Sequence, residues 1–104
     1  MTAQQLDKML CENVLRVRFV KRTNGAPRDM LCTKNLALLQ SSVGRLQLRW
    51  FPPKASAKYT PFNYNLTIVW DIRKRDYRTI CCDHVVVEES YDADEYRKML
   101  EATL

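Results

Sequence analysis

The run Cys81-Cys82-Asp83-His84 holds the side-chain types that bind metals or form nucleophilic pairs. It lacks a Cys-x-x-Cys spacing, and neighbouring residues of a strand point to opposite faces, so the two thiols would diverge. No third group is placed to orient a Cys-His pair. We therefore expect no metal site, no cofactor and no catalytic residue, so the protein is not predicted to be an enzyme. Cys32 and one thiol of the pair are expected to be buried as small apolar groups.

A second chemistry is offered by the segment from Arg45 to Tyr64, where aromatic and basic residues alternate. Rings can stack on nucleic-acid bases, each contributing about 1 to 3 kcal/mol, while lysine and arginine neutralise phosphates. The alternative is that Trp50, Phe51 and Phe62 fill the core and the lysines keep a loop solvated. The members predicted to bind a partner are Arg45, Arg49, Lys54, Lys58, Tyr59 and Tyr64.

A second basic cluster, Arg73-Lys74-Arg75 with Arg78, comes directly after a segment with the alternation of a strand, and its first three residues are expected to form a tight turn. These side chains could grip a phosphate backbone or an acidic protein, or they could form a solvated turn. Arg78, together with Arg28, could instead pair with Asp71 or Asp29 inside the fold, since arginine makes bidentate contacts with carboxylates.

Charge is distributed unevenly over the 104 residues, whose net charge is +5. Residues 1–82 carry fifteen bases and five acids, a net of +10, whereas residues 83–104 carry two bases and seven acids, a net of −5. A basic body attracts phosphates and acidic surfaces over roughly 8 to 10 Å at cellular salt. Alternatively, the acidic end folds back and neutralises the body, or the charge serves solubility alone.

The elements that must position these groups follow from periodicity and turn residues. Thr2 and Gln5 fit a capping box for a short helix, and Asn24-Gly25 fits a hairpin turn. The spacing of apolar residues predicts a helical turn from Leu36 to Gly44, and Leu46 to Trp50 alternates like a strand. The expected helices span about 3–12 and 92–103, and the other expected strands span 14–20, 28–33, 66–72, 77–82 and 85–87.

Short strands joined by hairpins, with a helix at each end, predict a single domain over residues 1–104. The fold class is mainly β with flanking helices, in which a small, strongly bent antiparallel sheet spans about 14–87. Open edges of so short a sheet invite aggregation, so we expect the sheet to close into a barrel. The apolar stripe of the last helix predicts core packing or a homo-oligomer contact.

Two stretches resemble a family of small bacteriophage proteins. Residues 17–33, VRFVKRTNGAPRDMLCT, resemble the hairpin F-T-K-K-D-G-T-x-R-x-M-x-C-T of that family, and residues 66–72 with 77–79 are similar to its V-x-V-W-D…W-R-S pair. These are the Sm-like, SH3-like barrel proteins of phages, sometimes grouped under the WYL name. The resemblance implies a five-stranded small barrel and a phage origin, and it implies little about activity. The chain departs from the pattern at Tyr77 and Thr79, and in its longer aromatic insertion.

Taken together, these features predict a non-enzymatic phage accessory protein that binds nucleic acid or a host protein that handles it. The alternative is a protein-only inhibitor of a bacterial host or defence enzyme, acting through the acidic C-terminal helix or the loop. The N-terminal residues lack the basic start and apolar stretch of a signal peptide, so we expect reduced thiols and the cytoplasm of the bacterial host. No apolar run predicts a membrane span.

Overall fold

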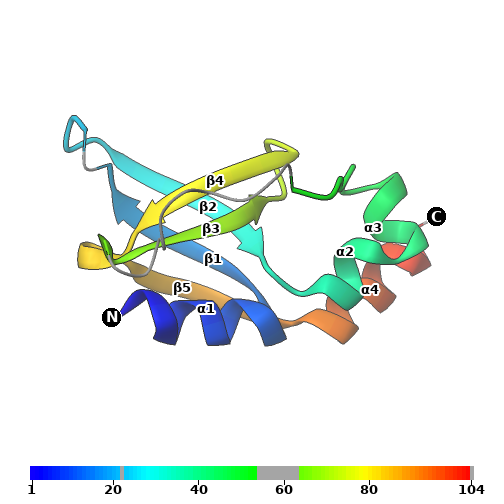
Figure 1. Ribbon diagram of the computed structural model, residues 1–104. Helices are drawn as coiled ribbons and strands as arrows, with labels where there is room; N and C mark the ends of the chain where they lie inside the picture. The colour runs from blue at the N-terminus through cyan, green and yellow to red at the C-terminus, as the bar shows by residue number, and fades with distance from the viewer. Residues whose placement is uncertain (22, 54–63, 104) are drawn as a thin grey trace.

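The computed structural model describes residues 1–21, 23–53 and 64–103, and their core is a five-stranded antiparallel sheet with strand order β4-β3-β2-β1-β5 (Figure 1). The elements, in chain order, are α1 (Ala3–Glu12), β1 (Asn13–Val20), β2 (Pro27–Thr33), α2 (Leu36–Gln40), α3 (Ser42–Leu46), β3 (Leu66–Asp71), β4 (Asp76–Cys81), the 3-10 helix η2 (Cys82–His84), β5 (Val86–Asp92) and α4 (Ala93–Ala102). No helix among these described residues is long and apolar enough to cross a membrane. The prediction of a mainly β fold flanked by helices is confirmed.

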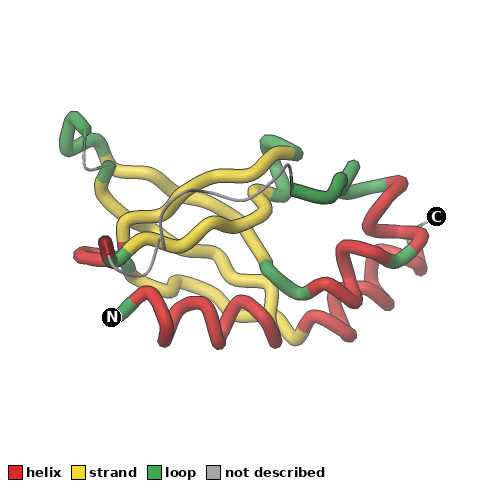
Figure 2. Tube along the Cα trace, viewed as in Figure 1, coloured by secondary structure: helices red, strands yellow, loops and turns green. Residues whose placement is uncertain are grey.

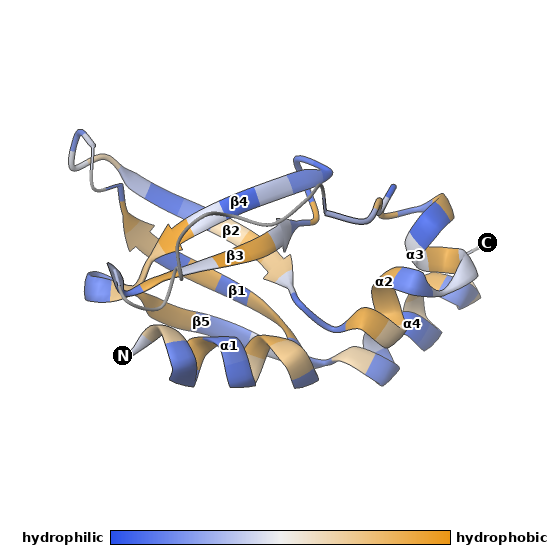
Figure 3. Ribbon diagram, in the orientation of Figure 1, coloured by the Kyte–Doolittle hydropathy of each residue, from blue (hydrophilic) through white to orange (hydrophobic). Residues whose placement is uncertain are grey.

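The first helix begins where its capping residues predict. The Thr2 hydroxyl accepts a hydrogen bond from the Gln5 backbone N–H at 3.2 Å, and the Gln5 side chain accepts one from the Thr2 N–H at 2.8 Å. This capping box satisfies two N–H groups that a helix start leaves unpaired. Leu6 and Leu10 are buried one turn apart on the same face of α1, so the helix packs its apolar stripe onto the sheet (Figure 3).

The β1–β2 hairpin is also confirmed, with Val14 opposite Thr33 at one end of the ladder and Val20 opposite Pro27 at the other. Gly25 adopts a φ of 69° in the connecting turn, a conformation that glycine reaches without the steric cost of a Cβ. The turn therefore fixes the register that the alternating strand pattern requires.

The sheet is bent but does not close, so the predicted barrel is wrong. β2 pairs with β3 only at Cys32–Asp71 and Thr33–Trp70, and beyond these two pairs the two hairpins diverge. β4 and β5 consequently remain the two edges of the sheet. The bend still brings Ile80 of β4 into one core cluster with leucines of α1, so the helix covers apolar area that closure would have covered.

A second core cluster lies on the other face of the sheet. The helices α2, α3 and α4, labelled in Figure 1, gather at one end of the molecule, where Figure 2 shows them in red. Trp70 is fully buried there with Leu38, and Tyr96 and Leu100 of α4 pack against the same cluster. Two members of the stripe of the last helix, Tyr96 and Leu100, thus serve core packing, whereas Met99 of the same stripe is exposed. The Asp92 side chain caps α4 by accepting hydrogen bonds from backbone N–H groups of the first turn of that helix. The strand before it, β5, extends well beyond the short strand expected at 85–87.

The strand predicted from Leu46 to Trp50 is not formed. Leu46 ends α3 and is 64% exposed, and Arg49 has a φ of 57°, which lies in the left-handed region. The Ser41 hydroxyl caps α3 by accepting a hydrogen bond from the Gly44 N–H. This cap starts a helix that runs to Leu46, so the alternating residues do not begin a strand there. The helical turn expected from Leu36 to Gly44 is confirmed as two short helices, α2 and α3.

Candidate polyanion-binding cleft

Alternation along the strands brings charged residues to one open mouth of the bent sheet. On β2, Arg28 lies two residues before Met30, which belongs to the core cluster inside the bend. On β4, Arg78 lies two residues before Ile80, which belongs to the same cluster. Because residues two apart share a face of a strand, both arginines stand on the inner face at the point where burial ends.

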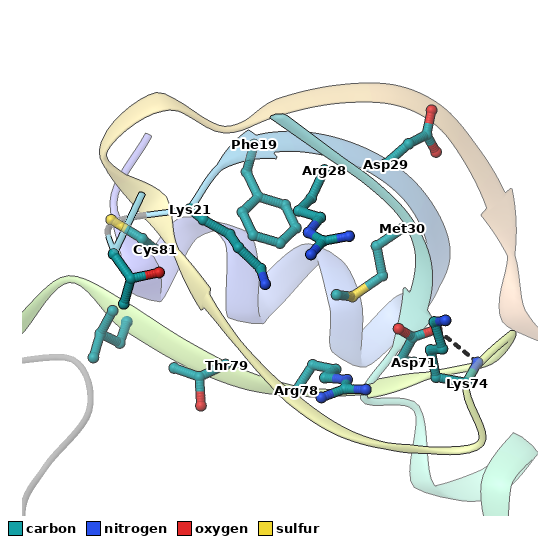
Figure 4. A pocket seen from close by; sticks show the side chains of 12 residues that line it. Phe19, Lys21, Arg28, Asp29, Met30, Asp71, Lys74, Arg78, Thr79 and Cys81 are labelled. Carbon is teal, nitrogen blue, oxygen red and sulfur yellow. Dashed lines mark hydrogen bonds between the residues drawn. The ribbon is translucent and has the colours of Figure 1, made fainter. Parts of the chain in front are cut away.

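The mouth is a cleft of about 590 Å³ between the two diverging hairpins. Figure 4 shows Lys21 and Arg28 from the β1–β2 hairpin on one side, and Lys74 and Arg78 from the β3–β4 hairpin on the other. The ring of Phe19 lies between them. The cleft therefore gathers four cations from segments far apart in the sequence.

Two carboxylates, Asp29 and Asp71, line the same cleft, and each accepts hydrogen bonds from other groups. Asp71 is 6% exposed and accepts hydrogen bonds from the backbone N–H groups of Arg73 and Lys74, both at 3.1 Å, so it builds the β3–β4 turn. Asp29 points away from the centre of the cleft in Figure 4 and accepts from the Arg16 guanidinium, at 3.1 Å from Nε and 2.8 Å from Nη2. These hydrogen bonds from Arg16 lower the pKa of Asp29.

The expected ion pairs between Arg28 or Arg78 and the carboxylates Asp71 or Asp29 are therefore absent from the described part of the chain. Strand alternation gives the reason for Asp29, which follows Arg28 directly and so faces the opposite side of β2. Asp71 shares the inner face, and its Oδ1 accepts the backbone hydrogen bonds of the turn that follows it. Neither arginine makes an ion pair with any described carboxylate.

The arginines on the outer face of β1 are in the opposite situation. Arg16 Nη1 lies 2.7 Å from a Glu89 carboxylate oxygen, and Arg18 Nη2 lies 3.0 Å from a Glu88 carboxylate oxygen. Both acids belong to β5, the edge strand that pairs with β1. The acidic end of the chain thus folds back onto the basic body, as one alternative from the charge distribution proposed, but it reaches the outer face and not the cleft.

The ten binding residues expected from the sequence are divided among several places. Lys74 and Arg78 line the cleft, and Arg73 and Arg75 are exposed on the adjoining turn. Exposed positions away from the cleft lining hold Arg45 on α3, Arg49 after it and Tyr64 before β3. Lys54, Lys58 and Tyr59 lie outside the described residues.

Lys21 and Arg28 were not expected to belong to a binding site. The sequence indicates their position by alternation along the strands. Lys21 follows Val17 and Phe19 at every second residue, and Arg28 lies two residues before Met30, so both cations belong to the inner face. The alternation is visible in the sequence, but the cleft arises only because the two hairpins diverge.

Two rings of the aromatic segment pack against the second core, the cluster around Trp70. The rings of Phe51 and Trp70 meet edge-on with centroids 5.0 Å apart, and Tyr77 contacts both rings in the same manner. The Tyr77 hydroxyl donates a 2.7 Å hydrogen bond to the Phe51 carbonyl oxygen. Trp50 is half-buried against the same cluster, so Trp50 and Phe51 contribute packing.

The cysteine and histidine run lies at the end of β4 and in η2. Cys81 is half-buried and its thiol donates to an Asp83 carboxylate oxygen at 3.2 Å, while His84 is exposed. Burial raises the pKa of Cys82 to about 11 and that of Cys32 to about 12, so both thiols stay protonated at neutral pH. The described residues contain no group of three or more histidine, cysteine or carboxylate side chains able to hold a metal ion.

No family model, curated protein or solved structure matches this chain.

Proposed function

We propose that this protein binds nucleic acid through the cleft between its two hairpins, by electrostatic docking and without catalysis. The observation that carries the proposal is the sorting of the cations. Lys21, Arg28, Lys74 and Arg78 converge on the cleft without a carboxylate partner among the described residues, whereas Arg16 on the outer face is paired twice. Nucleic acid carries a regular row of phosphates that can supply the missing anions.

The electrostatic origin of such binding makes it sensitive to salt. Each phosphate neutralised releases condensed counterions, so four contacts to duplex DNA weaken the association roughly 100-fold between about 50 and 200 mM salt. Contacts to a single strand give a slightly shallower dependence. From the sequence resemblance, we further propose that this docking serves a phage accessory role in the bacterial cytoplasm.

Charge reversal in the cleft tests the proposed function. We expect R28E/R78E to weaken binding of short oligonucleotides at least tenfold in fluorescence anisotropy at about 100 mM salt. The milder R28Q/R78Q variant should lower the magnitude of the salt slope by about 2, because two phosphate contacts are lost. Both arginines are exposed, so circular dichroism should show a retained fold.

The matched control is K8E/R45E, which changes the net charge by the same amount at exposed positions on α1 and α3. It should bind nearly as the parent protein does. Equal losses in both reversal variants would mean that net charge alone drives binding, and no binding of DNA or RNA at low salt would end the proposal.

A further inference from the structure

We infer that the cleft receives one unpaired nucleotide of a single strand, with its phosphate between the cations and its base against the apolar floor. This inference rests on the proposed function and specifies the form of the nucleic acid. It follows from the size of the cleft, from the chemistry of its lining and from the cations beside it.

The size of the cleft excludes a double helix from its interior. Its volume of about 590 Å³ falls within the range of roughly 300 to 1,000 Å³ that is typical of sites for small molecules. The major groove of duplex DNA alone is about 12 Å wide, so a duplex can touch only the rim. A single nucleotide is of the size that such a cavity encloses.

Beside its two carboxylates, the lining holds both kinds of group that a nucleotide needs. Phe19 and Met30 lie at the bottom of the cleft and belong to the core, and because they are 5% and 8% exposed, only a small part of each side chain reaches the cleft. Lys21, Arg28 and Arg78 reach over this floor from both hairpins (Figure 4). A base is a flat ring that contacts aromatic and thioether groups favourably, and its phosphate is bound by lysine and arginine.

The surroundings favour a nucleotide within a strand over a free nucleotide. Arg73 and Arg75 are exposed on the β3–β4 turn directly beside Lys74, so the positive charge continues past the cleft. A free nucleotide would leave these cations unused. The neighbouring phosphates of a strand would lie along the turn.

The first test compares four ligands in anisotropy at one salt concentration. They are a short single strand, the duplex of the same sequence, the same strand with abasic sites throughout, and a mononucleotide. We expect the single strand to bind about tenfold or more tightly than the abasic strand, since base stacking is lost while the phosphates remain. The duplex should bind more weakly than the single strand, and the mononucleotide should bind most weakly.

The second test locates the nucleotide by alkylation of cysteine. Cys81 is half-buried and lines the cleft, whereas Cys11 is exposed on α1 and lies outside it. A saturating concentration of the single-stranded oligonucleotide should slow the alkylation of Cys81 by iodoacetamide several-fold and leave the rate at Cys11 unchanged. The intact protein is labelled, then digested, and the labelled peptides are quantified by mass spectrometry. Cys11 thus serves as an internal control within one molecule.

The outcomes separate this inference from the proposed function. Equal affinities for the single strand, the duplex and the abasic strand would overturn the inference and leave nucleic-acid binding standing. Tight binding of the single strand without protection of Cys81 would also overturn it, because the base would then lie elsewhere. No binding of any ligand at low salt would overturn both.

Discussion

At the scale of single residues, position on a strand decides whether an arginine is paired. Arg16 stands on the outer face, where carboxylates of β2 and β5 flank it, and its pKa is raised by the hydrogen bonds to Asp29 and Glu89. Arg28 stands on the inner face of the neighbouring strand and makes no ion pair with a described carboxylate. The two residues have the same chemistry, and strand alternation alone gives the first a structural role and leaves the second available to a ligand.

The pairing of Asp29 with Arg16 predicts a pH-dependent contribution to stability. The pKa of Asp29 in the folded protein is below its ordinary value of 3.8, so the carboxylate form stabilises the fold. This contribution is present above the ordinary value and is lost as the pH falls through the lower pKa of the folded state. We expect D29N to be less stable than the parent near neutral pH, and the difference should shrink as the pH falls below 3.8 and through the lower pKa of the folded state.

Urea denaturation at several pH values measures this difference, with E12Q on an exposed position of α1 as the control. If D29N and E12Q change stability equally at neutral pH, or if the effect of D29N persists in acid, the ion pair does not stabilise the fold.

At the scale of elements, the corner between α2 and α3 depends on Gly44. A Cβ on this residue would collide with the backbone carbonyl oxygens of Leu38 and Leu39. These oxygens belong to α2 and have no freedom to rotate away. The Gly44 carbonyl also accepts from the Leu48 and Trp50 N–H groups, at 3.1 and 3.3 Å, so the corner determines where the chain goes after α3.

We therefore expect G44A to lower the free energy of unfolding more than G25A does. Gly25 has a positive φ but open space where a Cβ would lie, so its substitution should cost only the backbone strain of about 1 to 2 kcal/mol. G44A must displace one helix from another and should exceed that cost. Thermal and urea denaturation compare the two variants, and a G44A protein as stable as G25A would show that the corner is not closely packed.

The same corner shows where prediction from sequence ends. The capping box at Thr2 and the Asn24-Gly25 turn are local signals, so α1 and the first hairpin could be predicted from adjacent residues. Leu46, Leu48 and Trp50 alternate as a strand would, but whether they form one is decided by packing against residues distant in the chain. Local propensity is a weak guide in such a segment.

The candidate site fails to be predicted for a related reason. Arg78 and Lys74 attract notice because they belong to a basic cluster, and Arg28 does not. The cleft exists because β2 and β3 share only two residue pairs before they separate. The length of that ladder depends on the global bend of the sheet, which no residue pattern within one strand reveals.

At the scale of the whole molecule, strand pairing sorts the charges that the sequence keeps apart. Glu88 and Glu89 of β5 lie against the arginines of β1, and within α4 Arg97 pairs with Asp94 and Glu101, at 2.5 and 2.8 Å. Much of the acidic end is therefore neutralised internally. The alternative of an inhibitor with an acidic helix remains a prediction, and a nuclease-treated pull-down tests it by whether a stoichiometric protein partner survives.

Under the proposed function, this arrangement of charges predicts that the acids of β5 confine nucleic-acid binding to the cleft. The double variant E88Q/E89Q removes the Glu88 and Glu89 carboxylates of β5, which frees Arg18 while Arg16 keeps its pair with Asp29. About one additional phosphate contact should then become available on the outer face, so the salt slope should steepen by roughly 0.9 for duplex DNA. The affinity should rise at low salt, and D29N added to this variant should free Arg16 and steepen the slope again.

Anisotropy titrations over a range of salt concentrations measure these slopes, and E95Q/E101Q on α4 is the control with the same change in net charge. Glu101 pairs with Arg97, and neither Glu95 nor Glu101 makes an ion pair with Arg16 or Arg18 in the described part of the chain, so their removal should raise the affinity slightly without giving the arginines of β1 to the ligand. If both double variants steepen the slope equally, the acids act only through total charge. If neither does, the outer face takes no part in binding even when its arginines are unpaired, and the cleft alone defines the surface.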